Sequence, residues 1–287
     1  MKIIINRVYP NFAEQKMYIQ WEVESPPSVE ATFDVFRSES PTGGFEQIAS
    51  NLRNTYFYVD QFENTPGFFS LDRSIYYKVA ISCSGERVES NPVYFDGAIS
   101  ADPMEQRDVD ASYRHMKRNQ YDKQLRLLRN KLILDFKLGL EKIYGISAIL
   151  LKRKRWGTRC GLCYDPIANK QIKSHCDKCY DTTWVGGYIP TPILVHEQKP
   201  MPIQSGKDIP GPIEIKQTSF STLYFPKINY DDIIAIRYNN TRYHIKSVSD
   251  TYIRTIPIHQ TIISEIIPPD HIVYKIDIDT MEGMFNV

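Results

Sequence analysis

Apolar and polar residues alternate in short segments along the first hundred positions of the chain. In residues 17–24, Ile19, Trp21 and Val23 occupy alternate positions, and residues 75–83 repeat the pattern. Alternation with a period of two is typical of β-strands that bury one face. Turn-forming residues separate the segments, and strands of this length and spacing predict a β-sandwich over residues 1–98. The expected strands are residues 2–8, 17–24, 32–38, 45–49, 56–60, 75–83 and 88–95.

A helical period replaces the alternation after residue 101. Apolar and aromatic residues recur at steps of three and four, with one step of five, as far as residue 143. Asp102 suits the N-cap and Pro103 the first helical position. We therefore expect one long helix in the segment 99–148, with a kink or an end at Gly139 or Gly145.

The other face of this expected helix is basic, and a second basic cluster follows at residues 152–155, with Arg159 close behind. Such a surface could contact nucleic-acid phosphates or an acidic protein ring. It could equally be an ordinary solvated helix face. We favour contact, because a helix of this length needs a surface to lie against. The cations of the helix are Arg114, Lys117, Arg118, Lys123, Arg126, Arg129 and Lys131.

Four cysteines form two C-x-x-C pairs, Cys160 with Cys163 and Cys176 with Cys179. Two such pairs at this separation strongly indicate a tetrahedral structural Zn²⁺ site. Four thiolates would leave no coordination position for water or substrate, so the site is expected to hold a shape. Few apolar residues lie in this module, assigned to 149–190, and the ion is expected to contribute about 10 kcal/mol or more to its folding.

Three alternatives compete with a structural zinc site. A redox pair would need a βαβ setting and only one C-x-x-C, and iron–sulfur clusters use other spacings. A zinc ribbon that binds single-stranded nucleic acid would stack bases on Trp156 or Trp184. We prefer the interpretation in which both tryptophans pack against the cysteine pairs, with His175 as a surface side chain. The fifth cysteine, Cys83, is expected to be a buried thiol in a strand.

Strand signals return in the segment 191–287, after a stretch that is rich in proline. Pro190, Pro192 and later prolines predict an extended, draped chain. Residues 232–238 and 242–248 flank an Asn-Asn-Thr turn and predict a hairpin. With further strands expected at 252–258, 260–267 and 272–278, the segment predicts a small β-barrel.

Composition limits the function classes. The chain of 287 residues carries 35 basic and 34 acidic side chains, so any preference for nucleic acid would be local. We expect no signal peptide, no transmembrane helix and no membrane partner, because the longest apolar stretch is short and interrupted by glycine. Cysteines in metal spacing favour a reducing compartment. No nucleophile elbow, phosphate loop or H-E-x-x-H motif occurs, and we therefore expect that the protein is not an enzyme.

The first segment resembles a fibronectin type III domain, which has an immunoglobulin-like fold. The resemblance is carried by Trp21, by FDVFRS and GGFEQIA in residues 33–49, and by IYYKVAI and SNPV in residues 75–93. It covers roughly residues 1–97 and implies a module that serves as a spacer or an adhesive decoration.

The remaining chain resembles virion proteins of tailed bacteriophages. The resemblance is carried by RNQYDKQLRLLRNK (118–131), by LLKRKRWGTRCGLCYD and SHCDKCYDTTWVGGY (150–188), and by YDDIIAIRYNNTRYHIKSV and IHQTIISEIIPPDHIVYKI (230–276). The last of these is similar to the small β-barrels of head–tail joining proteins.

This resemblance implies a neck or head–tail connector subunit with a mainly β, multidomain fold. Copies of the chain would form a ring that meets portal or adaptor and tail proteins, in a virion made in the cytoplasm of the host bacterium. The basic residues could also contact DNA. Many connector proteins lack a fibronectin-like module, which leaves a tail or collar adhesive protein as an alternative. A zinc-dependent nucleic-acid-binding protein is the other alternative.

Overall fold

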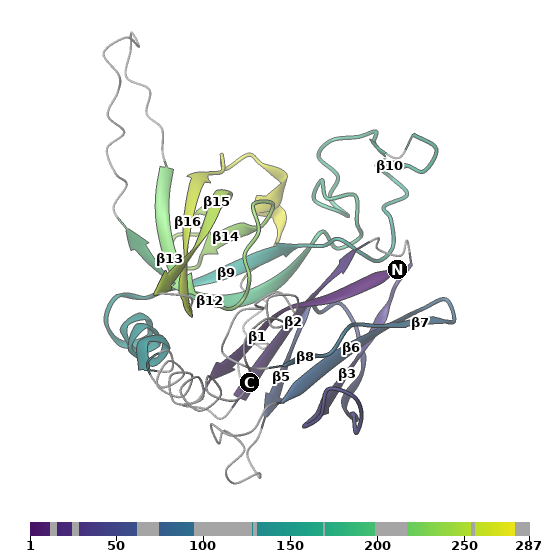
Figure 1. Cartoon of the computed structure of the whole chain (residues 1–287). Helices are drawn as coiled ribbons and strands as arrows, with labels where there is room; N and C mark the ends of the chain where they lie inside the picture. Colours follow the sequence, from purple (N-terminus) through teal and green to yellow (C-terminus); the bar gives the residue numbers. More distant parts are fainter. Residues whose placement is uncertain are drawn as a thin grey trace, which may run out of the picture. The chain divides into compact units, whose positions relative to one another are not determined.

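The computed structural model divides the chain into two compact units (Figure 1). Unit 1 comprises Met1–Lys137, Tyr224–Lys227 and Thr251–Ile258, and unit 2 comprises Leu138–Leu223, Ile228–Asp250 and His259–Val287. Each unit is described by itself. The structure describes residues 1–11, 16–24, 29–61, 75–94, 128, 131–168, 170–198, 217–253 and 256–278.

Two antiparallel sheets form most of unit 1. One has the order β1-β2-β5, and the other the order β4-β3-β6-β7, with β8 also pairing with β6. Alternate side chains of the central strands β2, β3 and β6 are buried. The Trp21 ring lies 5.3 Å from the Phe33 ring, which joins a residue of β2 to one of β3. The mainly β fold is thereby confirmed. The strands are β1 (Lys2–Asn11), β2 (Lys16–Glu24), β3 (Thr32–Ser38), β4 (Glu46–Leu52), β5 (Phe57–Gln61), β6 (Tyr76–Cys83), β7 (Glu86–Glu89) and β8 (Val93–Tyr94).

The short segment 224–227 also belongs to unit 1, far in sequence from the two sheets. Its Phe225 ring lies 4.9 Å from the Tyr18 ring and 5.8 Å from the Phe57 ring. The fully buried Gln20 of β2 accepts a hydrogen bond from the Lys227 backbone nitrogen at 2.7 Å. The side-chain amide thus satisfies a backbone donor that has no strand partner, which explains a polar residue at a buried position.

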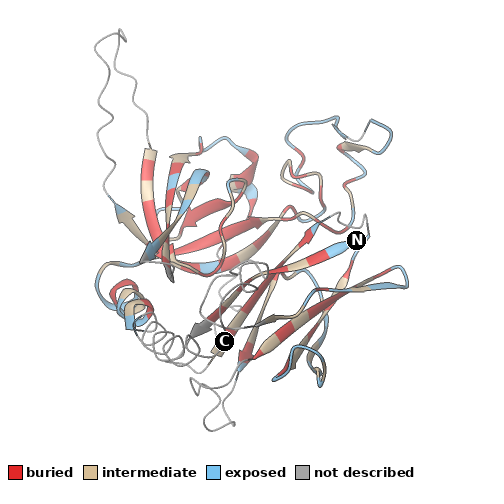
Figure 2. Cartoon of the chain, viewed as in Figure 1, coloured by how far each residue is buried: buried red, intermediate tan, exposed pale blue. Residues whose placement is uncertain are grey.

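A closed six-stranded barrel forms the centre of unit 2, with the order β12-β13-β16-β15-β14-β9 (Figure 1). Its interior is filled by aliphatic side chains and Phe220, and Figure 2 shows the buried positions along these strands. The small β-barrel expected from the sequence is present. The barrel strands are β9 (Ile146–Arg153), β12 (Tyr188–Gln198), β13 (Gln217–Leu223), β14 (Ile233–Ile236), β15 (Arg242–Ile253) and β16 (Ile256–Ile266).

The barrel begins earlier in the chain than the segment 191–287 to which the sequence assigned it. Strands β9 and β12 are neighbours in the barrel, with Arg153 opposite Tyr188 in their register. The cysteine module is therefore an insertion between two barrel strands, although the sequence indicated a domain of its own before the barrel. The run of apolar residues at 146–151 is compatible with the end of a helix and with a buried strand. Pairing with β12 and β14 shows that it is a strand.

Two prolines expected in a draped segment lie instead inside β12. Pro190 stands opposite Leu151 and Pro192 opposite Ile149, at alternate positions of the ladder. Residues two apart in an antiparallel ladder form the same type of cross-strand pair. Both prolines can therefore occupy pairs that need no backbone N–H bond to β9, and the ladder stays intact. The β13 pairing begins only at Val195, so the prolines lie where β12 has one neighbour. Later prolines, from Pro200 to Pro212, lie outside the described residues.

The strand expected at residues 272–278 is wrong, because this segment contains a short 3₁₀ helix, η2 (Ile272–Lys275). The side chain of His271 accepts a hydrogen bond from the Val273 backbone nitrogen and caps the helix. Ile276 and Ile278 are buried in a second apolar cluster with Ile149 and Leu151 of β9. The apolar pattern therefore predicted correctly which side chains are buried. It predicted the wrong secondary structure, because the closed barrel has no free edge at which this segment could pair as a strand.

Only the end of the expected long helix lies within the described residues. Residues 131–139 are helical, and a π-helical turn, η1 (Leu140–Tyr144), ends at Gly145. The expected end at Gly145 is confirmed, and the rest of the expected helix, from residue 102 to residue 130 apart from residue 128, lies outside the described residues. No helix within the described ranges is long and apolar enough to cross a membrane.

A buried ion pair ties β9 to the start of β14. Lys152 Nζ lies 2.8 Å from Asp232 Oδ2, and both side chains are almost fully buried. Asp232 also accepts hydrogen bonds from the backbone nitrogens of Arg153 and Asn229, at 3.0 and 2.8 Å. Three donors thus converge on one carboxylate, which is the arrangement that makes a buried charge tolerable.

We expect Asp232→Ala to destabilise unit 2 by about 3–5 kcal/mol, because the buried Lys152 ammonium would lose the carboxylate that neutralises it. Hydrogen exchange of the β9 and β14 amides measures this locally. The control is Glu265→Ala, which removes the partner of Lys246 in a pair whose side chains are about half exposed. It should cost less than about 1 kcal/mol. Equal losses in the two variants would contradict the prediction.

Candidate metal centre

The module between β9 and β12 starts and ends at one place on the barrel. The Lys154 backbone nitrogen donates to the Gly187 carbonyl at 2.9 Å, which continues the β9–β12 pairing into the module. The Lys154 ammonium, itself buried, donates to the Val185 carbonyl at 3.1 Å. Further out, Arg159 and Trp184 form an isolated bridge. The two ends of the module are therefore held together by backbone pairing and by a buried lysine.

Each cysteine pair forms the same tight turn. The backbone nitrogens of Cys163 and Tyr164 donate to the Cys160 carbonyl, at 3.4 and 3.0 Å. In the second turn, Cys179 and Tyr180 donate in the same way to the Cys176 carbonyl, at 3.4 and 2.8 Å. We call these turns the first and second knuckle. The repeated geometry aims two thiols from each knuckle at a common point.

All four sulfur atoms lie within 4.8 Å of one another, and all four cysteines are buried. The sulfurs of Cys160 and Cys176 are 3.7 Å apart, and those of Cys163 and Cys179 are 3.1 Å apart. A tetrahedron around an ion with 2.3 Å metal–sulfur bonds has edges of about 3.8 Å. A disulfide would need about 2.05 Å. The spacing of the thiols therefore fits a shared metal ion.

The environment of the thiols favours one thiolate over the others. Burial raises the pKa of Cys163 well above its usual value, and hydrogen bonding with the Cys179 thiol adds to this. Burial also acts to raise the pKa of Cys176, but hydrogen bonds involving the Lys178 backbone and the Cys160 thiol lower it to about 7. A cation at the centre would favour the thiolate at every position, because its charge offsets their mutual repulsion.

The sequence did not single out Asp181, which braces the second knuckle. One carboxylate oxygen accepts hydrogen bonds from the Cys176 backbone nitrogen and from the Gln171 side chain, both at 3.1 Å. The backbone of Asp181 is left-handed, with φ of 62°. An Asp just after a C-x-x-C pair is the kind of residue that can orient a ligand through the backbone. His175, in contrast, is exposed and is not part of the thiol cluster, as expected.

Both tryptophans of the module are buried, as expected, although the apolar cluster around the thiols consists of the four cysteines without either tryptophan. Trp156 and Trp184 expose 5% and 6% of their surface. The Arg159 guanidinium lies 3.6 Å from the Trp184 ring centroid and 4.4 Å from that of Tyr164. That cation already covers the indole face, so base stacking on these tryptophans would require the module to open.

The basic cluster at residues 152–155 is used within the molecule. Lys152 and Lys154 are buried, with the partners described above. Arg153 and Arg155 both pair with Asp231, at 3.6 and 3.1 Å. The sequence interpretation of this cluster as a surface for phosphates is therefore wrong for the two lysines, because their ammonium groups are buried and bonded to Asp232 and to the Val185 carbonyl.

Cys176→Ser should abolish metal binding and unfold the module, because a serine hydroxyl is a poor ligand and the module has little apolar core of its own. Metal analysis and hydrogen exchange of residues 156–187 report the two effects. Cys83→Ser is the matched control, since Cys83 lies in β6 of unit 1 and should leave metal content unchanged. Full metal content in Cys176→Ser would contradict the role of this thiol.

Similarity to known proteins is limited for this chain. No protein-family model matches it, and no curated protein matches it. Among solved structures, a pectate lyase from Erwinia chrysanthemi in complex with tetragalacturonic acid is similar at 17% identity and a TM-score of 0.24, over 33% of this chain and 28% of the lyase.

A second pectate lyase, from Pectobacterium carotovorum, is similar at 18% identity and a TM-score of 0.28, over 39% of this chain and 30% of the lyase. An Fn3-like protein from Clostridium thermocellum is similar at 17% identity and a TM-score of 0.24, over 32% of this chain and 82% of that protein. The chain spans less than a third of the length of either lyase. Likenesses with TM-scores this low carry no argument about fold or function.

Proposed function

We propose that the protein is a structural subunit of a tailed-phage virion, a neck or head–tail connector protein that forms a ring between the capsid portal and the tail. The observation that carries the proposal is the insertion of a four-thiol module between two paired strands of a closed barrel. Both ends of the module continue the β9–β12 pairing, so a bound ion would make it a stiff projection from the barrel. The resemblance of residues 118–131, 150–188 and 230–276 to phage virion proteins supports the same role.

We infer that the ion is Zn²⁺ and that its role is structural. Four thiolates are soft ligands in tetrahedral arrangement, which is the ligand set that zinc takes in structural sites. When bound, the ion supplies charge neutralisation and cross-linking of the two knuckles. The four sulfurs would fill its coordination shell, and the proposed role is therefore not that of an enzyme.

The remaining parts of the chain take their proposed roles from the sequence. The two-sheet part of unit 1 would be a fibronectin type III-like, immunoglobulin-like decoration, and the basic helix would lie at a ring interface. The proposed organisation keeps the divisions 1–98, 99–148, 149–190 and 191–287 as functional segments, with β9 and β12 contributing to the barrel. The partners would be other copies of the chain, portal or adaptor proteins and tail proteins.

The nucleic-acid alternative is the weaker proposal. Of its basic residues, Lys152 and Lys154 are buried, Arg153 and Arg155 share the carboxylate of Asp231, and Arg159 stacks on Trp184. The two lysines would have to leave the interior before either could neutralise a phosphate, and the two arginines have only one carboxylate between them. Of the cations on the basic face of the expected helix, Lys131 is exposed and the others lie outside the described residues, so contact with DNA stays a prediction for this face.

We expect about one zinc ion per chain in full-length protein purified without added metal. Stripping it with a strong chelator should expose Trp156 and Trp184 and shift their fluorescence to longer wavelength, because the ion stabilises the module that buries them. Elemental analysis and fluorescence before and after dialysis measure both effects, with re-addition of Zn²⁺ as the control. Iron in place of zinc, or unchanged fluorescence after complete stripping, would contradict the structural zinc site.

We also expect the purified chain, with a portal or tail partner, to assemble into closed rings visible by electron microscopy. Antibody labelling should place it at the neck of assembled particles. Particles made with Cys176→Ser should lack the protein, whereas particles made with Cys83→Ser should contain it. A chain that remains monomeric and is absent from particles would exclude the connector role.

A further inference from the structure

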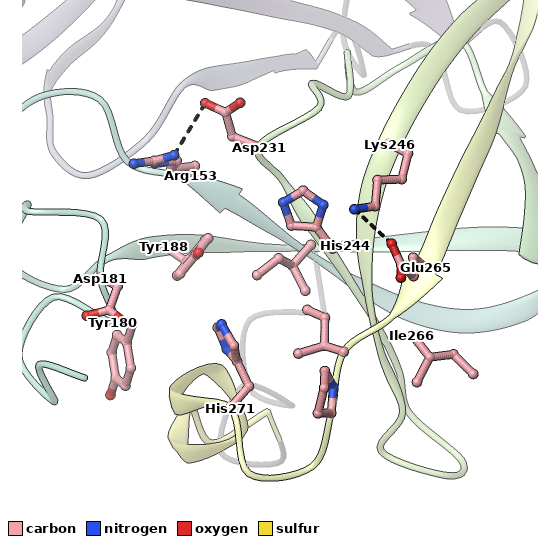
Figure 3. Close-up of a pocket in the computed structure, with 13 residues that line it drawn as sticks. Arg153, Tyr180, Asp181, Tyr188, Asp231, His244, Lys246, Glu265, Ile266 and His271 are labelled. Carbon is pink, nitrogen blue, oxygen red and sulfur yellow. Dashed lines mark ion pairs between the residues drawn. The ribbon is translucent and has the colours of Figure 1, made fainter. Parts of the chain in front are cut away.

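A pocket opens on the outer face of the barrel, beside the second knuckle (Figure 3). Tyr243 and Ile245 of β15 point into the barrel core, so His244 and Lys246, at the alternate positions, point outward into this pocket. Tyr180 and Asp181, directly after Cys179, line the same pocket. The cavity volume is about 370 Å³, near the lower limit for a small-molecule site.

The pocket has apolar surface in its lining. Ile233 and Ile267 line it, and both are buried members of the second apolar cluster of unit 2. Tyr180 and Tyr188 line it as well and pack against the same cluster. A ligand held here would therefore place an apolar face against isoleucine and tyrosine side chains.

Most charged groups around the pocket are arranged as ion pairs; the exception is Asp181, whose carboxylate accepts hydrogen bonds within the cysteine module. Arg153 pairs with Asp231 at 3.6 Å, and Lys246 pairs with Glu265 at 2.8 Å (Figure 3). Arg155 also pairs with Asp231, at 3.1 Å, so three cations accompany the three carboxylates around the pocket, and the lining offers donors and acceptors without a strong preference for a charged ligand. This argues for an uncharged ligand that carries several hydroxyl groups.

Two histidines flank the pocket from opposite sides (Figure 3). His271 accepts a hydrogen bond from the Val273 backbone nitrogen at Nδ1, so in the neutral ring Nε2 carries the hydrogen and can donate to a ligand. Partial desolvation in the pocket lowers the pKa of the largely exposed His244, and nearby Lys246 adds to this, which favours a neutral ring that can donate and accept. Both rings can therefore donate a hydrogen bond to an uncharged ligand.

We propose that this pocket binds an uncharged saccharide, one or two hexose units in size. The CH face of the sugar would lie against the apolar lining, and its hydroxyls would meet the histidines and the paired charges. A peptide is the less suitable occupant, because strands β9, β14, β15 and β16 are each paired on both sides in the closed barrel and offer no free edge for strand addition. The proposal does not depend on the connector role.

The test is saturation-transfer NMR on the full-length, metal-loaded chain at neutral pH. The neutral probes are methyl β-D-glucopyranoside, maltose, cellobiose and N,N′-diacetylchitobiose, and the charged probes are galacturonic acid and glucosamine. At least one neutral probe should bind with a dissociation constant on the order of 1 mM, and the charged probes should bind more weakly.

His244→Ala is the first variant. The His244 side chain is exposed, so its removal should leave the fold intact. It should weaken saccharide binding about five- to tenfold, as expected for one hydrogen bond in a polar site. His271→Ala should act similarly, with hydrogen exchange of residues 272–276 showing whether η2 remains. The matched control is His196→Ala on β12. The His196 ring lies 4.4 Å from the Tyr144 ring and does not line the pocket, so this change should leave binding unaltered.

Several results would overturn the proposal. They are binding of none of the neutral saccharides, tighter binding of a charged probe, and saccharide binding that both pocket variants leave unchanged. A peptide that displaces a bound saccharide at lower concentration would assign the pocket to a protein partner instead. None of these results bears on zinc content or on ring assembly, so the two proposals fail separately.

Discussion

Four buried thiols within 4.8 Å of one another impose the constraint on which the rest of the inserted module depends. Thiols this close cannot all ionise unless a cation offsets their charge, so folding of the module and occupancy of the site are coupled. The consequence reaches beyond the four cysteines. Asp181 and Tyr180, which follow Cys179 directly, line the pocket on the barrel, so the geometry of that pocket depends on the second knuckle.

The attachment of the module shows how the barrel positions a small metal centre. The insertion leaves β9 and returns in β12, and these strands are hydrogen-bonded neighbours. The four basic residues 152–155 at this joint alternate between buried lysines and partly exposed arginines. Lys152 and Lys154 are buried and hold Asp232 and the Val185 carbonyl, while Arg153 and Arg155 share Asp231. The two lysines of a cluster that looks like a phosphate-binding surface in the sequence are therefore part of the internal structure of the joint.

The errors in the sequence predictions have a common physical cause. Pro190 and Pro192 predict a draped chain, yet both fit into β12 where that strand has one neighbour. Residues 272–278 predict a strand, yet the closed barrel offers no edge, and a capped 3₁₀ helix buries the same side chains. In each case the local pattern reported burial or extension, whereas pairing was decided by residues distant in the sequence.

What the sequence determined by itself is local. The spacing of the two C-x-x-C pairs identified all four members of the thiol cluster, because each knuckle needs only its own turn to aim two sulfurs. The alternation of apolar residues identified the strands that bury Trp21 and Phe33, because the face that a strand residue occupies also follows from its local position. Only the tertiary structure decided that the barrel includes β9, that Asp181 braces the second knuckle, and that His244 and His271 face one pocket. These groups come from segments that no sequence period connects, and closure of the barrel is what brings them together.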